Sequence, residues 1–297
     1  MGAKMVDVDV NVVIKIIDQS NKRDELPKQL KQLLPEWESG KKKPTISQLR
    51  ILARSLKRPF AEFFMQEPLP DPSADTRRYR FNDTIPLSFK SSLAIRDANA
   101  HLEELVELLE EPIAILPKAS IKDDPKTIAE TLKQKFKLHI ARKNAKDKRE
   151  YFKIVRNILE NNGIFVFQYS LPLDELRGFS IWNDKAAVIA CSTKDEPESR
   201  TFTLMHELGH LILRNHGICD IQLKVEWNDV ETWCNRFAGY ILIDINETLK
   251  QEITRKLKEL NIGKVVEKYA SHFKVSKAAI AKQLEIIKLI SHQEFIE

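Results

Sequence analysis

Two histidines four residues apart, with a glutamate directly after the first, are the strongest chemical signal in this sequence. His206, Glu207 and His210 lie within residues 201–213, where apolar residues recur at helical spacing. Side chains four residues apart share one face of a helix, with Cβ atoms about 5–6 Å apart. Two imidazoles placed in this way can bind one metal ion, and imidazole nitrogen suits zinc.

Glu207 indicates what such a metal would be used for. It lies off the line of the two histidines, so it can reach a water on the metal without displacing a ligand. Zinc lowers the pKa of a bound water to about 7, and a carboxylate beside that water can accept its proton. We therefore interpret Glu207 as a general base that helps water to attack a carbonyl group.

A third ligand is expected, because catalytic zinc is held by three protein ligands and keeps one position open. Glu231 stands in the first turn of a second amphipathic helix, predicted to start near residue 228. Two helices that cross at their apolar faces can bring Glu231 beside the histidines. The other candidates, none of them placed by a regular element, are Asp220, Asp229 and His216.

The residues that follow Glu231 carry weaker signals. Cys234 lies one turn further on but belongs to the apolar stripe, so we interpret it as a packing residue. Asn235 shares the face of Glu231 and could orient it, although an exposed asparagine fits the pattern equally well. No residue stands out as the stabiliser of an oxyanion, for which the candidates are Arg236, Tyr240 and His216.

The elements that must position these residues form a mostly helical pattern with a small sheet. A strand is predicted at 164–167, and two β-prone runs at 178–182 and 186–191 predict a hairpin. Thr45 and Gln48 have the spacing of a capping box, and Ser276 is expected to cap the last long helix. Further helices are predicted at 91–109, 125–138, 147–160 and 201–213, and from residue 228 onward.

The composition is typical of a soluble globular protein of about two domains. Of 297 residues, 42% are hydrophobic and 31% are charged, and no apolar run approaches the 18 or so residues that span a membrane. The first residues show no signal-peptide core, so we expect a cytoplasmic protein without a membrane partner. The three cysteines are irregularly spaced, which predicts buried thiols rather than disulfides.

Positive charge is concentrated near the N-terminus. Residues 21–60 hold 11 Lys or Arg against 4 Asp or Glu, in a chain whose net charge is +5. Such a stretch suggests nucleic acid or an acidic partner, although a solvated helical surface has the same composition. The candidate nucleic-acid contacts are Lys41, Lys42, Lys43 and Arg50, with Arg54 and Arg58 nearby.

Three stretches resemble the ImmA/IrrE family of metallopeptidases: residues 178–181 (GFSI), 202–210 (FTLMHELGH) and 231–238 (ETWCNRFA). The resemblance covers roughly residues 160–290. It implies an α+β, gluzincin-like fold with a small antiparallel sheet, and one zinc ion held by His206, His210 and Glu231, with Glu207 as catalytic acid/base. One departure is Ile243-Asp244, where the family commonly has an apolar residue followed by proline.

The resemblance also implies a partner. Members of the family often cleave a repressor of the helix-turn-helix class, and they are often encoded in toxin–antitoxin or stress-response systems. We therefore expect the protein substrate to be a helix-turn-helix repressor or an antitoxin.

The N-terminal part is similar to an Xre-type helix-turn-helix domain, through residues 37–40 (WESG), Pro44-Thr45 and the helix that follows. About three residues are missing between Leu30 and Pro35, where the reading helix should begin. A recognition helix needs its N-terminal residues to touch base edges, so the shortening argues against sequence-specific DNA binding.

Together these patterns predict a mostly helical α+β chain in three parts. A small all-α helix-turn-helix-like domain occupies residues 1–70, a helical connecting region 71–159, and the zinc peptidase domain 160–297. The predicted function is an intracellular zinc-dependent endopeptidase that acts on a regulatory protein. The alternative is a DNA-binding transcriptional regulator or toxin–antitoxin component in which the peptidase domain is a sensor or interaction module.

Overall fold

The computed structural model describes residues 8–20, 22–69, 79–80, 83–84, 87–112, 116–214 and 227–296. The chain divides into two compact units, Met1–Asn99 and Ala100–Glu297, and the boundary between them falls inside helix α5 (Phe89–Leu108). Of the helices described, none is long and apolar enough to cross a membrane.

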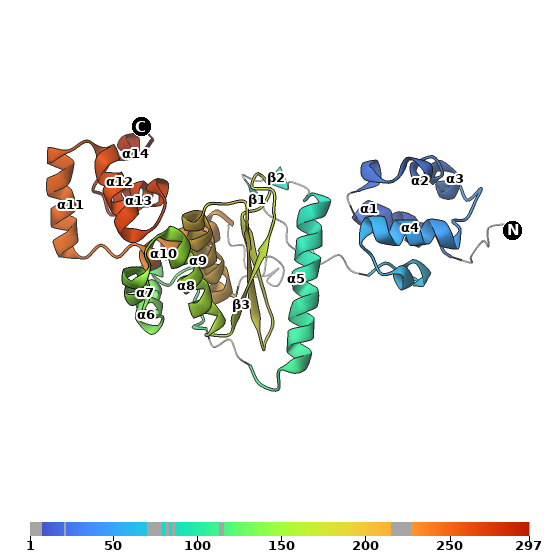
Figure 1. Ribbon diagram of the computed structural model, residues 1–297, viewed down its shortest axis with the longest axis horizontal. Helices are drawn as coiled ribbons and strands as arrows, with labels where there is room; N and C mark the ends of the chain where they lie inside the picture. Colours follow the sequence, from blue (N-terminus) through green and yellow to red (C-terminus); the bar gives the residue numbers. More distant parts are fainter. Residues whose placement is uncertain are drawn as a thin grey trace. The chain divides into compact units, whose positions relative to one another are not determined.

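The first unit is helical over residues 8–64, the blue elements of Figure 1. Its core gathers Ile16, Trp37, Leu52 and Phe63, each at most 1% exposed, whereas Phe64 is 45% exposed. The predicted capping box is confirmed, because Thr45 and Gln48 exchange both hydrogen bonds. The elements are α1 (Val10–Gln19), η1 (Arg23–Glu25), α2 (Lys28–Lys31), α3 (Leu34–Glu38), α4 (Ile46–Leu56), η2 (Phe60–Phe64) and the short paired strands β1 (Tyr79–Arg80) and β2 (Asp83–Thr84).

A three-stranded sheet lies in the second unit, in the order β3 (Ile164–Tyr169), β5 (Ala187–Ser192), β4 (Gly178–Trp182). Strands β4 and β5 form the predicted antiparallel hairpin. Strand β3 pairs with β5 in parallel, with Ile164 opposite Ala187, so the expectation of a purely antiparallel sheet is wrong. The reason is strand order: β4 takes the outer place and β5 returns between its two predecessors, in the direction of β3.

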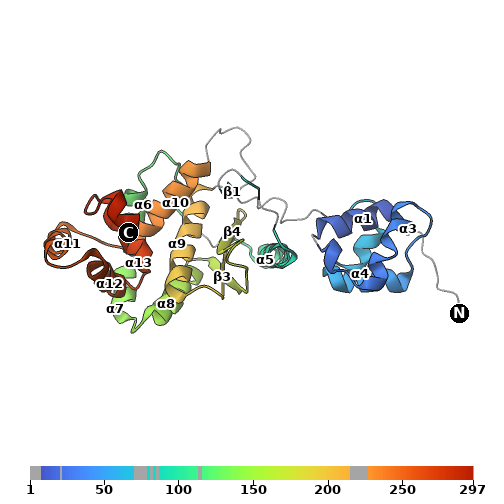
Figure 2. The ribbon, with the colours of Figure 1, turned by 90° about the horizontal axis from the view of Figure 1, so that it is seen from above.

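The helices of the second unit pack with this sheet around one core. Figure 2 shows α9 (Pro197–Leu213) between the sheet and α10 (Trp227–Leu242), and α9 contacts both. Helices from the predicted connecting region contribute to the same core, through residues such as Leu132 and Phe152. The remaining helices are α6 (Pro125–Lys135), α7 (Leu138–Asn144), α8 (Lys148–Glu160), α11 (Glu247–Glu259), α12 (Ile262–Phe273), α13 (Lys277–Ile286) and α14 (His292–Ile296).

Two smaller predictions are confirmed in this unit. Ser276 caps α13, with its side chain accepting a hydrogen bond from the amide of Ala279. Cys191 and Cys234 are buried free thiols. Cys219 lies outside the described residues.

Candidate metal centre

Helix α9 carries the two histidines through the middle of the unit. Its first turn contains Pro197, and its last helical residue is Leu213. The next residue, Arg214, has a left-handed backbone and caps the helix by donating its amide to the carbonyls of His210 and Leu211. Most of its residues are buried because the sheet lies on one side and α10 on the other. His210 is 8% exposed and Glu207 is 3% exposed, so both functional candidates are largely shielded from water.

Helices α9 and α10 approach closely at Gly209. A Cβ atom on Gly209 would lie 3.1 Å from Sγ and 3.3 Å from Cα of Cys234. Cys234 therefore packs against the glycine, and its pKa is raised well above the ordinary value by burial and then by the carboxylates of Glu231 and Glu207. A thiol that resists ionisation is a poor metal ligand, which agrees with the packing role expected for Cys234.

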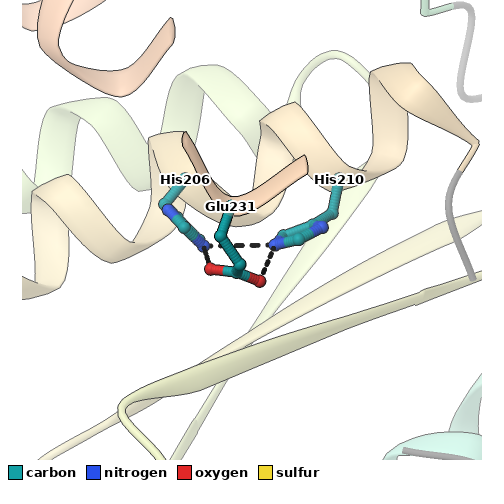
Figure 3. A group of neighbouring side chains, drawn as sticks. All are labelled: His206, His210 and Glu231. Carbon is teal, nitrogen blue, oxygen red and sulfur yellow. Dashed lines mark hydrogen bonds and ion pairs between the residues drawn. The ribbon is translucent and has the colours of Figure 1, made fainter. Parts of the chain in front are cut away.

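Glu231, one turn before Cys234, meets both histidines (Figure 3). Its Oε2 lies 3.2 Å from Nε2 of His206, and its Oε1 lies 3.2 Å from Nε2 of His210. The two Nε2 atoms are 3.1 Å apart. Of the alternative third ligands, Asp229 is exposed on α10, and Asp220 and His216 lie outside the described residues.

The tautomer of His206 follows from its other neighbour. Oδ1 of Asn235 lies 3.0 Å from Nδ1 of His206. A carbonyl oxygen only accepts hydrogen bonds, so this contact holds a proton on Nδ1 and turns Nε2 toward Glu231. The sequence suggested that Asn235 orients Glu231, whereas its contact is with His206 on the facing helix.

This donor set fits a zinc ion. Two imidazole nitrogens and one carboxylate, which are ligand types that zinc accepts, face one another at 3.1 to 3.2 Å. Burial raises the pKa of Glu231, but its contacts with the two imidazoles outweigh burial and hold that pKa well below the usual range, so the residue is anionic. Ligands of zinc at 2.0–2.1 Å stand about 3.3 Å apart in a tetrahedron, close to the separations found here.

Glu207 does not join this group but meets strand β4. Oγ of Ser180 donates a hydrogen bond to Oε2 of Glu207, at 2.9 Å. The strand can come so close because residue 178 is glycine: a Cβ there would lie 2.3 Å from Cγ2 of Thr203 and 2.6 Å from the carbonyl oxygen of Ala190. Ser180 stands in one of the stretches that resemble the family, but its role could not be predicted, because nothing local shows which residue a strand presents to a helix.

The other candidates lie away from these four residues. Arg236 is exposed and Tyr240 half-buried on α10, and the geometry selects neither as an oxyanion stabiliser. In the first unit, Lys42 pairs with Glu36 at 2.9 Å, and the guanidinium of Arg50 lies 5.7 Å from the ring centroid of Phe60. Lys41 and Lys43 are exposed.

Arg58 is 6% exposed and bonds Glu62 at 3.1 Å, inside the first unit. The interpretation of Arg58 as part of a basic surface is therefore wrong. Its charge is neutralised by the buried carboxylate of Glu62 rather than offered to a ligand.

Comparison with known proteins agrees with this geometry. No curated protein matches the chain. Residues 159–285, which include the sheet and helices α9 to α13 almost to their end, match the family model Peptidase_M78, described as an IrrE N-terminal-like domain. This match supports the ImmA/IrrE peptidase family for that part of the chain, and with it a metallopeptidase that carries His206, His210 and Glu231 as a possible metal-binding group.

Proposed function

We propose that the second unit is a zinc-dependent endopeptidase that acts inside the cell on a regulatory protein, with a helix-turn-helix repressor or an antitoxin as its substrate. The observation that carries the proposal is the convergence of His206, His210 and Glu231 from two helices, with the carboxylate of Glu207 held apart from them. Three protein ligands and a separate carboxylate are the arrangement that hydrolytic zinc sites require.

The residues at the metal position hold the ion and set its charge. His206 and Glu231 are held by α9 and α10, and Asn235 fixes the ring of His206 with Nε2 turned toward the other two donors. Zinc, when bound there, supplies a Lewis acid that polarises the substrate carbonyl and lowers the pKa of water. The anionic Glu231 makes the site attractive to a divalent cation and leaves it a net positive charge once filled.

Glu207 moves the proton. It accepts the proton of the attacking water on its carboxylate and then gives it to the nitrogen of the departing amine. The hydrogen bond from Ser180 keeps this carboxylate turned in one direction, so that it does not swing toward the ligands as a competing donor. Burial at 3% exposure keeps bulk water from competing for the proton.

Strand β4 is suited to hold an extended polypeptide. In the part of the chain that the structure describes, β4 is an outer strand of the sheet, and an outer strand is where an extended peptide adds to a sheet. Because β4 also carries Ser180, a segment bound along it would pass close to Glu207. This supports a peptide substrate over a small amide.

We further propose that the first unit is a helix-turn-helix-like module that recognises protein rather than DNA. Its helices α2 and α3, where a reading helix is expected, have four and five residues. A helix that short presents little more than one turn to a major groove. Of the candidate nucleic-acid contacts, Lys42 and Arg58 already pair with carboxylates.

The test compares the parental protein with Glu207→Gln, each co-expressed with a candidate helix-turn-helix repressor. We expect about one zinc per chain in both proteins and a cleavage product with the parental protein alone. The matched control is Glu198→Gln on the same helix, which loses an ion pair with Lys148 and should still cleave. Cleavage by Glu207→Gln at the parental rate would show that the mechanism is wrong.

A further inference from the structure

A groove of about 430 Å³ runs between α10 and α13, beside the candidate metal centre. It begins at Asn235, the residue that contacts His206, and reaches past Gly239 on α10. Phe202 on α9 and Ala279 and Ile286 on α13, all partly buried, give it apolar walls. This volume lies within the range of about 300–1,000 Å³ that is typical of ligand sites.

Arg236 gives the groove an unbalanced positive charge. Its side chain is exposed and, in the part of the chain that the structure describes, it has no ion pair or hydrogen bond. The other cation of the lining, Lys282, lies 2.7 Å from Glu285, and Glu285 also lies 2.7 Å from His292. The charge that remains for a ligand is therefore that of Arg236.

Gln283 adds an amide that no described residue satisfies. It is 3% exposed and lines the groove. Its Oε1 packs against Gly239, because a Cβ atom on that glycine would lie only 2.6 Å from Oε1. A side-chain amide offers both a donor and an acceptor, which suits the N–H and C=O groups of a peptide backbone. The amide of Gln283 therefore lies where it can hydrogen-bond a segment held in the groove.

We infer that this groove holds a segment of the protein substrate that is apolar apart from one acidic residue, and that Arg236 selects its carboxylate. The inference rests on the proposed peptidase function, since the segment would be the continuation of a chain that passes the metal centre. Arginine binds a carboxylate through two parallel N–H···O bonds, which makes it selective as well as attractive. The apolar walls and the amide of Gln283 suit a peptide better than a free inorganic anion.

The inference is tested by peptide binding, with full-length zinc-loaded Glu207→Gln protein so that no probe is cut. The probes are fluorescein-labelled heptapeptide pools in which one position at a time is fixed as Glu, Gln or Lys. We expect one position at which the Glu pool binds about tenfold tighter than the Gln pool. Arg236→Glu should reverse this preference toward Lys, and Arg236→Gln should abolish it.

The matched control is Arg255→Glu, an exposed arginine on α11 that does not line the groove. It should leave the Glu preference unchanged, and thermal unfolding should show that all variants remain folded. The inference is overturned if no position prefers Glu, if the preference survives in Arg236→Glu, or if Arg255→Glu removes it equally. The binding assay and the cleavage assay can fail separately. If Arg236→Glu reverses the binding preference but the parental protein cleaves no substrate, the groove is supported and the peptidase proposal is refuted.

Discussion

Asn235 shows how a residue outside the ligand group can set the chemistry of a ligand. Its carbonyl oxygen holds a proton of His206 on Nδ1, so the ring is fixed with Nε2 toward the candidate metal position. Partners of this kind typically contribute tenfold to a hundredfold to metal affinity. From the sequence, Asn235 was expected only to orient Glu231, because the spacing within one helix does not show which residues of another helix pack against it.

Asn235→Ala is expected to weaken zinc binding by about tenfold to a hundredfold, because His206 then loses the acceptor that fixes its ring. Competition with a chromophoric chelator measures the dissociation constant. Asn235→Asp should retain tight binding, since a carboxylate also accepts the Nδ1 proton. Thr232→Ala, an exposed change on the same helix, serves as the control. An unchanged zinc affinity in Asn235→Ala would mean that His206 is oriented by other contacts.

At the scale of the elements, the site depends on two close approaches to α9. Helix α10 comes close at Gly209 and brings Glu231, and strand β4 comes close at Gly178 and brings Ser180. The tighter of the two is the contact of β4. A Cβ at position 178 would meet Cγ2 of Thr203 on α9 and, at 2.6 Å, the carbonyl oxygen of Ala190 on the neighbouring strand β5, and this backbone oxygen cannot rotate away as a side chain can.

Gly178→Ala should therefore lower the free energy of unfolding by about 1–3 kcal/mol, because the extra methyl group forces β4 and α9 apart. It should also slow cleavage, since Ser180 would withdraw from Glu207. Chemical denaturation and a cleavage assay measure the two effects. Gly263→Ala on α12 is the control: its nearest neighbour would be Oδ1 of Asn261 at 3.7 Å, so it should be no less stable than the parent. Equal stability of both variants would contradict a tight contact at β4.

The elements differ in how far the sequence could predict them. Helices such as α8 and α13 were predictable, because a periodic apolar stripe and a capping residue are local features, as at Asp147 and Ser276. The order of the strands was not, since β3 and β5 are far apart in sequence and β5 is buried throughout, with no alternation to show its neighbours. The contact between Ser180 and Glu207 depends on that order and was missed with it.

The grouping of the candidate metal ligands was predictable for a different reason. His206 and His210 share a face by the geometry of one helix, so their joint position follows from spacing alone. Glu231 required a second helix to cross the first, and the crossing was expected from two apolar faces and from the family resemblance. The groove at Arg236 was not expected at all, because α13 lies more than 40 residues further along the chain. Spacing within α10 cannot show where α13 packs.

At the scale of the whole molecule, the two units have separate cores. The core of the first unit is built from residues between Val8 and Phe63, and that of the second from residues between Leu116 and Ile290. The candidate metal ligands His206, His210 and Glu231 lie in the second unit, and the capping box of α4 lies in the first. A perturbation in one core should therefore leave the stability of the other unchanged, since distant sites without shared partners behave additively.

Zinc and the variant Thr45→Ala can test this separation together. Free zinc at about a thousandfold excess over its dissociation constant should stabilise the second unit by about 4 kcal/mol, because it binds the folded site and not the open chain. Thr45→Ala removes one of the two capping hydrogen bonds and should cost the first unit about 1 kcal/mol. Calorimetry of the full chain, with zinc or with a chelator, should then show two unfolding transitions. Zinc should raise the midpoint temperature of one, and Thr45→Ala should lower the midpoint temperature of the other. If zinc raises both midpoint temperatures equally, or if Thr45→Ala lowers the midpoint of the zinc-dependent transition, the two cores unfold as a single cooperative body.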